Sequence, residues 1–327
     1  MQNALEVRFV LPRSNRRNAN PPLLFIHGAY CDAWCWEVHL LPWFAAAGYP
    51  AYALSLRGHG KSPGRDDLGS LHLADYMDDI RSVVAELPAR PVLIGHSMGA
   101  TLVERLIAEE TFPGAALVCP VPPSGLLPVL TRLWWGRPDF FWHAQKLHRG
   151  AIDPVAMSTL REFYFTTHAP PEILAGAMRH LSPESPQAVM ELAWRGLSAR
   201  AEEHDTPVCV LAAGDDALFT PDEVRATAAR HGVDAMVLPG LPHMLMLEPG
   251  WERLAEALRD WIRRSVRLAA TRRSMPASRT ASARSLSACV PSDSRLPMPM
   301  RASAVAEAAR TASSGSRMRR VRSATAF

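Results

Sequence analysis

Two kinds of hydrophobic pattern alternate along the first 119 residues. Short apolar runs predict strands at 6–10, 22–26, 51–54, 92–94 and 114–119, and apolar residues at helical spacing predict helices at 36–47, 73–87 and 98–110. The run at 22–26 is continuously apolar, which is typical of a parallel strand buried on both faces. Strand and helix in alternation predict an α/β fold with a doubly wound, mostly parallel sheet.

The alternation stops at Pro120. From there to about residue 200 the chain is rich in prolines and large apolar residues, with no strand pattern. Strands are again predicted at 207–212 and 234–238, and helices at 221–230 and from Trp251 onwards. We therefore expect a core made of 1–119 and 201–266, with 120–200 inserted as a helical cap over the carboxyl edge of the sheet.

The last part of the chain, 267–327, has a different composition. It is dominated by Ser, Ala, Arg and Pro with few large apolar residues, so burial cannot offset its ordering entropy and we expect a disordered tail. Residues 265–327 carry a balance of +10, which leaves −6 for 1–264 out of a net charge of +4. The tail arginines suit an acidic partner or a membrane surface, but little aromatic interleaving and no nucleic-acid fold signature argue against nucleic acid.

The composition of the whole chain is that of a globular protein. Of its 327 residues, 48% are hydrophobic and 21% charged. It has no uninterrupted apolar run of the roughly 18 residues that a membrane span needs, so we expect no transmembrane segment and a cytoplasmic protein. The scattered cysteines at 31, 35, 119, 209 and 289 lack zinc-site spacing, so we expect free thiols, no metal and no cofactor.

The candidate chemistry starts at Gly95-His96-Ser97-Met98-Gly99, between the strand at 92–94 and the helix that follows. In a G-x-S-x-G between strand and helix, the serine occupies a sharp, strained turn that holds its hydroxyl above the sheet. A glycine-flanked serine in an ordinary turn is the alternative. The strand and helix on either side favour Ser97 as a nucleophile.

A serine nucleophile needs a base, and the base needs an orienting carboxylate. Where such a serine follows a strand and opens a helix, the acid and then the histidine come after it along the chain. Asp216 is favoured over Asp215 because it begins the loop after the strand at 207–212. His243 follows the last strand, whereas His231 precedes Gly232 at a predicted helix end, where capping explains it.

Other residues complete the predicted site. The backbone N–H groups of Ala29 and Met98 are the candidate oxyanion donors, and His27 is expected to brace the loop rather than transfer protons. Gly28, at the carboxyl end of its strand, is assigned to substrate binding. Most aromatic residues of the cap are expected to hold it together, and three of them are expected to contact substrate: Trp134, Phe141 and Phe163.

Five motifs in order resemble the α/β-hydrolase superfamily, particularly its lysophospholipase and monoacylglycerol-lipase-like serine esterases. They are FIHGAY, SLRGHGKS, GHSMGA, GDDALFTP and LPHMLMLEP, and together they span nearly all of the first 260 residues. Ala100 departs from the glycine that many relatives have there, and the tail has no counterpart. The resemblance implies the α/β-hydrolase fold and a Ser97–His243–Asp216 triad.

The expected function is hydrolysis of a small-molecule carboxylic ester through an acyl-enzyme on Ser97, and the apolar cap indicates a hydrophobic acyl group. Thioester, amide or carbon–carbon bond hydrolysis and acyl transfer use the same triad and stay open. A ligand receptor that kept the fold without turnover is the alternative from another class. The sequence does not predict the oligomeric state.

Overall fold

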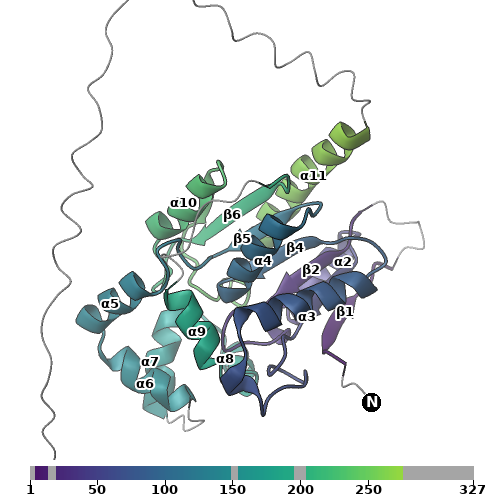
Figure 1. Cartoon of the computed structure of the whole chain (residues 1–327). Helices are drawn as coiled ribbons and strands as arrows, with labels where there is room; N and C mark the ends of the chain where they lie inside the picture. The colour runs from purple at the N-terminus through teal and green to yellow at the C-terminus, as the bar shows by residue number, and fades with distance from the viewer. Residues whose placement is uncertain (1–3, 14–19, 149–153, 195–203, 275–327) are drawn as a thin grey trace, which may run out of the picture. The chain divides into compact units, whose positions relative to one another are not determined.

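The computed structural model describes residues 4–13, 20–148, 154–194 and 204–274, which all belong to one compact unit, 1–275 (Figure 1). Its strands are β1 (Val7–Val10), β2 (Leu23–Ile26), β3 (Ala51–Leu54), β4 (Val92–His96), β5 (Ala115–Val118), β6 (Val208–Ala213) and β7 (Ala235–Leu238). Outside the cap, its helices are α1 (Trp34–Glu37), α2 (Leu40–Ala46), α3 (Leu73–Glu86), α4 (Met98–Glu109), α10 (Pro221–Arg230) and α11 (Glu252–Ser274).

Within these ranges seven strands form one sheet in the order β1-β3-β2-β4-β5-β6-β7. β1 pairs antiparallel with β3, and every other pair is parallel. The predicted mostly parallel, doubly wound sheet is confirmed. Because the parallel strands end at the same edge, the loops after β2, β4, β6 and β7 are brought to one side of the molecule.

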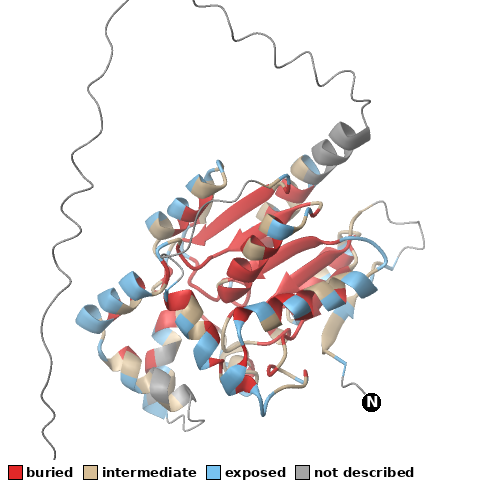
Figure 2. Cartoon of the chain, viewed as in Figure 1, coloured by how far each residue is buried: buried red, intermediate tan, exposed pale blue. Residues whose placement is uncertain are grey.

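Helices cover both faces of the sheet. Along β2, Leu24 and Ile26 belong to the hydrophobic cluster that includes residues of α3, α4 and α10, whereas Leu23 and Phe25 belong to the cluster with α1, α2 and α11. Alternate side chains of one strand therefore enter opposite layers. Figure 2 shows the consequence, since the central strands are buried throughout.

The described part of the cap is helical, as predicted. It consists of α5 (Leu127–Gly136), α6 (Asp139–His148), α7 (Pro154–Tyr164), α8 (Pro171–Arg179) and α9 (Pro186–Ala193), which lie together at one end of the sheet (Figure 1). Prolines at the first turns of α5, α8 and α9 suit helix starts, because the missing N–H has no partner there anyway.

The structure differs from the prediction at the last helix. We expected the disordered tail to begin at 267, but α11 continues to Ser274. Leu, Ala and Arg residues in 267–274 favour a helix that is already nucleated, so propagation past the packed part costs little. The rest of the predicted tail, from 275, lies outside the described residues. No helix within the described ranges has the length and hydropathy of a bilayer-spanning segment.

Candidate active site

Ser97 stands at a strained turn between β4 and α4, as the motif predicts. Its backbone has φ +54° and ψ −118°, a conformation that a residue with a side chain rarely adopts. The turn requires small neighbours, because a Cβ at Gly95 would lie 2.3 Å from the carbonyl oxygen of Gly99, and one at Gly99 would lie 2.4 Å from that of His27. The close approach of β4, α4 and β2 thus explains both glycines.

Asp216 and His243 meet behind this turn. The imidazole Nδ1 of His243 lies 2.7 Å from Oδ2 of Asp216, and both residues are buried. The other carboxylate oxygen, Oδ1, accepts the backbone N–H groups of Leu218 and Phe219 at 2.8 and 2.9 Å. These bonds hold the carboxylate in place, so that a neutral His243 carries its proton on Nδ1 and keeps the Nε2 lone pair available.

The competing residues, Asp215 and His231, lie outside the contact between Asp216 and His243. Asp215 is exposed beside the buried Asp216. His231 is the C-cap residue of α10, followed by Gly232 at φ +65°, and its Nδ1 bonds Nε2 of His204 at 2.9 Å. Neither belongs to the group around Ser97 and His243.

His27 braces the loop after β2. Its Nδ1 donates to the carbonyl oxygen of Gly28 at 2.8 Å, and its Nε2 accepts the N–H of Leu56 at 3.0 Å. Burial, together with the nearby His59, lowers the pKa of His27 to about 4. The ring is therefore neutral near pH 7, and its two hydrogen bonds hold Gly28 next to the loop after β3.

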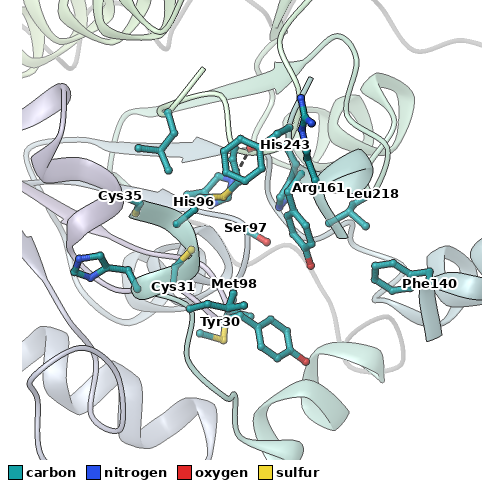
Figure 3. A pocket seen from close by; sticks show the side chains of 18 of the residues that line it. Tyr30, Cys31, Cys35, His96, Ser97, Met98, Phe140, Arg161, Leu218 and His243 are labelled. Carbon is teal, nitrogen blue, oxygen red and sulfur yellow. Dashed lines mark hydrogen bonds between the residues drawn. The ribbon is translucent and has the colours of Figure 1, made fainter. Parts of the chain in front are cut away.

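Ser97 and His243 line one cavity of about 680 Å³ (Figure 3). The two residues with candidate oxyanion N–H groups, Ala29 and Met98, line it as well. Gly28 lies just behind them, since a Cβ on it would be 3.0 Å from Cβ of Ser97. The predicted nucleophile, base and oxyanion donors are thus brought to the same space.

Of the three cap aromatics assigned to substrate, one lies in the cavity wall. Phe141 lines the cavity. Trp134 does not, and 57% of its surface is exposed on α5. Phe163 is buried inside the cap with its ring 4.5 Å from that of Phe140. Helical spacing alone could not separate these cases, because it does not say which face of a cap helix turns inward.

Two residues beside the predicted triad, His96 and Cys119, were not singled out from the sequence. Burial and then the neighbouring His243 lower the pKa of His96 well below its usual value, so its ring is neutral, and its Nε2 donates to the carbonyl oxygen of His243 at 3.0 Å. Burial and the Asp216 carboxylate raise the pKa of Cys119, which keeps its thiol protonated. Their places at the carboxyl ends of β4 and β5 could have indicated them.

The ligand atoms of His96, Cys119 and His243 lie within 4.8 Å of one another. Such a grouping resembles a metal site, and hydrogen bonds engage one ring nitrogen of each histidine, Nε2 of His96 and Nδ1 of His243. His243 and Cys119 both contact Asp216, and His96 contacts the backbone of His243, so these contacts account for the grouping.

Buried polar contacts attach the cap to the core beside the cavity. Glu184, before α9, accepts from the Tyr76 hydroxyl at 2.6 Å and lies 3.1 Å from Nε2 of His59. Burial alone would lower the pKa of His59 and raise that of Glu184, but their mutual attraction reverses both directions. Nearby, Nδ1 of His180 lies 2.8 Å from Oδ2 of Asp32. The cap is therefore joined to the loops after β2 and β3.

Comparison with known proteins agrees with the fold. The model of the alpha/beta hydrolase family matches residues 23–257, which is most of the chain, and the chain belongs to this family. Enzymes among its relatives include a monoacylglycerol lipase from Mycolicibacterium smegmatis, 28% identical over 68% of this chain and 81% of the relative. A probable esterase from Oryza sativa is 29% identical over 49% of this chain and 60% of its own length.

Solved structures show the same fold. The monoacylglycerol lipase of Paleococcus ferrophilus superposes with a TM-score of 0.55 at 21% identity, over 79% of this chain and 98% of its own. A thermophilic esterase from Thermogutta terrifontis superposes with a TM-score of 0.56 at 20% identity, over 80% of this chain and 94% of its own. The expected α/β-hydrolase fold and the resemblance to esterases and lipases are confirmed.

Proposed function

We propose that this chain is a serine hydrolase that cleaves a carboxylic ester with a hydrophobic acyl group. The observation that carries the proposal is the buried His243–Asp216 contact of 2.7 Å on the same cavity as Ser97, whose turn has a positive φ. The named relatives, a lipase and an esterase, support ester hydrolysis as the reaction class.

The geometry supports a reaction in two halves. Ser97 Oγ attacks the ester carbonyl carbon while Nε2 of His243 takes its proton, and the N–H groups of Ala29 and Met98 stabilise the oxyanion. When the intermediate collapses, His243 returns the proton to the leaving alcohol and the acyl group stays on Ser97. Water, deprotonated by His243, then releases the acid and restores the serine.

The apolar cavity wall supports an acyl chain as the larger part of the substrate. The residues from the cap that line it include Leu126, Val129, Leu133, Leu174, Met178 and Leu192. An acyl chain in this space is removed from water on binding, which favours binding by about 0.8 kcal/mol for each buried methylene. We therefore expect kcat/KM to rise with acyl length until the cavity is filled.

Fluorophosphonate labelling followed by p-nitrophenyl esters of increasing acyl length tests the proposal. The protein should be labelled at one serine and should turn over the esters, and Ser97→Ala should lose both properties. Ser70→Ala is the matched control, because it removes an exposed hydroxyl outside the G-x-S-x-G motif. This variant should keep both labelling and ester turnover. Equal turnover by Ser97→Ala and the unaltered protein would refute the role of Ser97, and absence of labelling would favour the receptor alternative.

A further inference from the structure

One cap helix contributes three successive polar side chains to a cavity wall that is mostly apolar on the side of the cap. Ser158, Arg161 and Tyr164 of α7 all line the cavity. They are spaced three residues apart, so they follow one another along a single helix face. The aromatic ring of Tyr164 lies 5.9 Å from that of His243, and the exposed Ser158 lies about 1.7 helical turns before Tyr164. Arg161 is therefore between the outer end of this face and the base.

The helix face is held next to the predicted base. The carbonyl oxygen of Tyr164 accepts the backbone N–H of Met244, the residue after His243, at 3.0 Å. Two residues after the end of α7, Thr166 donates its backbone N–H and its hydroxyl to the buried carboxylate of Glu248, at 2.7 and 2.9 Å. These bonds tie the end of α7 to the loop that carries His243.

Arg161 differs from two other arginines of the cap in its contacts. Arg132 and Arg137 contact carboxylates of Glu223, Asp139 and Glu162. Within the described part of the chain, the guanidinium of Arg161 has one hydrogen-bond partner, the carbonyl oxygen of Thr167 at 3.2 Å. A guanidinium has five N–H donors, and the bond to Thr167 uses one of them, while Arg161 lines the cavity (Figure 3).

The cavity has a carboxylate of its own, but it is already engaged. Asp32 accepts the N–H of Trp34 at 2.7 Å through Oδ1 and contacts His180 through Oδ2. Beside Arg161, burial raises the pKa of the Tyr164 phenol, which keeps its hydroxyl neutral and able to donate. The α7 face therefore presents donors with a net positive charge next to the reacting centre.

We propose that Arg161 binds an anionic group, a carboxylate or a phosphate, on the alcohol part of the ester, with Ser158 and Tyr164 as further donors. Arginine recognises both anions through paired N–H bonds. The acyl chain occupies the apolar wall formed by the other cap helices. This inference rests on the proposed ester hydrolysis at Ser97 and adds the substrate class.

Two pairs of decanoyl esters test the proposal. Butyl decanoate is compared with the decanoyl ester of 4-hydroxybutanoate, and 1-decanoylglycerol with its 3-phosphate. The readout is the ratio of kcat/KM for the anionic ester to that for its neutral partner, with active protein counted by fluorophosphonate labelling. In Arg161→Gln the ratio should fall about 10- to 100-fold for the preferred anion, as expected for loss of a charge-assisted hydrogen bond.

Arg179→Gln is the matched control, because Arg179 is exposed on the cap helix α8, carries the same charge and does not line the cavity. Its ratio should equal that of the unaltered protein. If Arg161 only supports the structure through its bond to Thr167, Arg161→Gln would lower kcat/KM for both esters of a pair equally. The ratio would then stay unchanged, and this result would overturn the inference. Failure to label Ser97 or to cleave any of the four esters would instead overturn the proposed function itself.

Which pair responds identifies the anion. If the kcat/KM ratio falls in Arg161→Gln for the carboxylate pair alone, the substrate is an ester of a hydroxy acid. If the ratio falls for the phosphate pair alone, the substrate is an acylated alcohol phosphate. A fall in both supports a site for either anion.

Discussion

At the scale of single residues, the Asp216–His243 contact carries the most specific prediction. Asp216→Asn keeps the size of the side chain but removes the charge that stabilises a protonated His243. We expect kcat for a p-nitrophenyl ester to fall by about 10³- to 10⁴-fold. Asp215→Asn is the control, because Asp215 is exposed, and it should change kcat little. Similar losses in both variants would contradict the assignment of the acid.

A second residue-scale prediction concerns the turn around Ser97. Gly99→Ala places a Cβ 2.4 and 2.5 Å from the carbonyl oxygens of His27 and Ile26, which are held in place by the sheet. We expect the free energy of unfolding in urea to fall by about 3 kcal/mol. Gly69→Ala has open space around the added methyl group and should stay within about 0.5 kcal/mol. If Gly99→Ala leaves the midpoint of urea unfolding unaltered, the turn around Ser97 can shift to accommodate the added methyl group, which would contradict the prediction.

At the scale of elements, the cap is attached to the core by a pH-sensitive pair. The pKa of His59 is raised above 6.5 and that of Glu184 is lowered below 4.5. The raised pKa of His59 contributes to the free energy of unfolding. This contribution is complete below pH 6.5 and is lost as pH rises through the pKa of His59 in the folded protein. The glutamate contribution is complete above pH 4.5 and is lost as pH falls through its folded pKa. The pair therefore stabilises the fold most between about pH 4.5 and 6.5.

Thermal melting of the protein and of His59→Gln across this range checks the expectation. The loss of melting temperature caused by the substitution should be largest near pH 5.5 and should shrink above the folded pKa of His59. His168→Gln, an exposed cap position, should melt like the unaltered protein at every pH. A loss for His59→Gln that does not vary with pH would mean that the pair is not charged.

At the scale of the whole molecule, the compact unit ends at Met275 and contains both hydrophobic clusters and the candidate site. We therefore expect that removing 276–327 leaves the melting temperature and fluorophosphonate labelling unchanged. It should change the net charge from +4 to −3, because these residues carry nine arginines and two acids. Ion-exchange elution reports the charge, and calorimetry reports the melting temperature. A markedly lower melting temperature would show that 276–327 stabilises the unit.

The sequence by itself determined the order of strands and helices, the place of the cap and the residues of the proposed triad. Those features depend on local causes: continuous apolar runs, helical spacing, and a serine between two glycines at a strand end. Even the choice of Asp216 over Asp215 followed from its position in a loop.

Only the tertiary structure decided which side chains share the cavity. It placed Phe141 in the wall, Trp134 in solvent and Phe163 inside the cap, and it brought His96 and Cys119 to the triad. It also showed Arg161 facing the cavity without a carboxylate partner among the described residues. These facts depend on how helices far apart in the chain rotate and pack against one another, and no local pattern encodes that rotation.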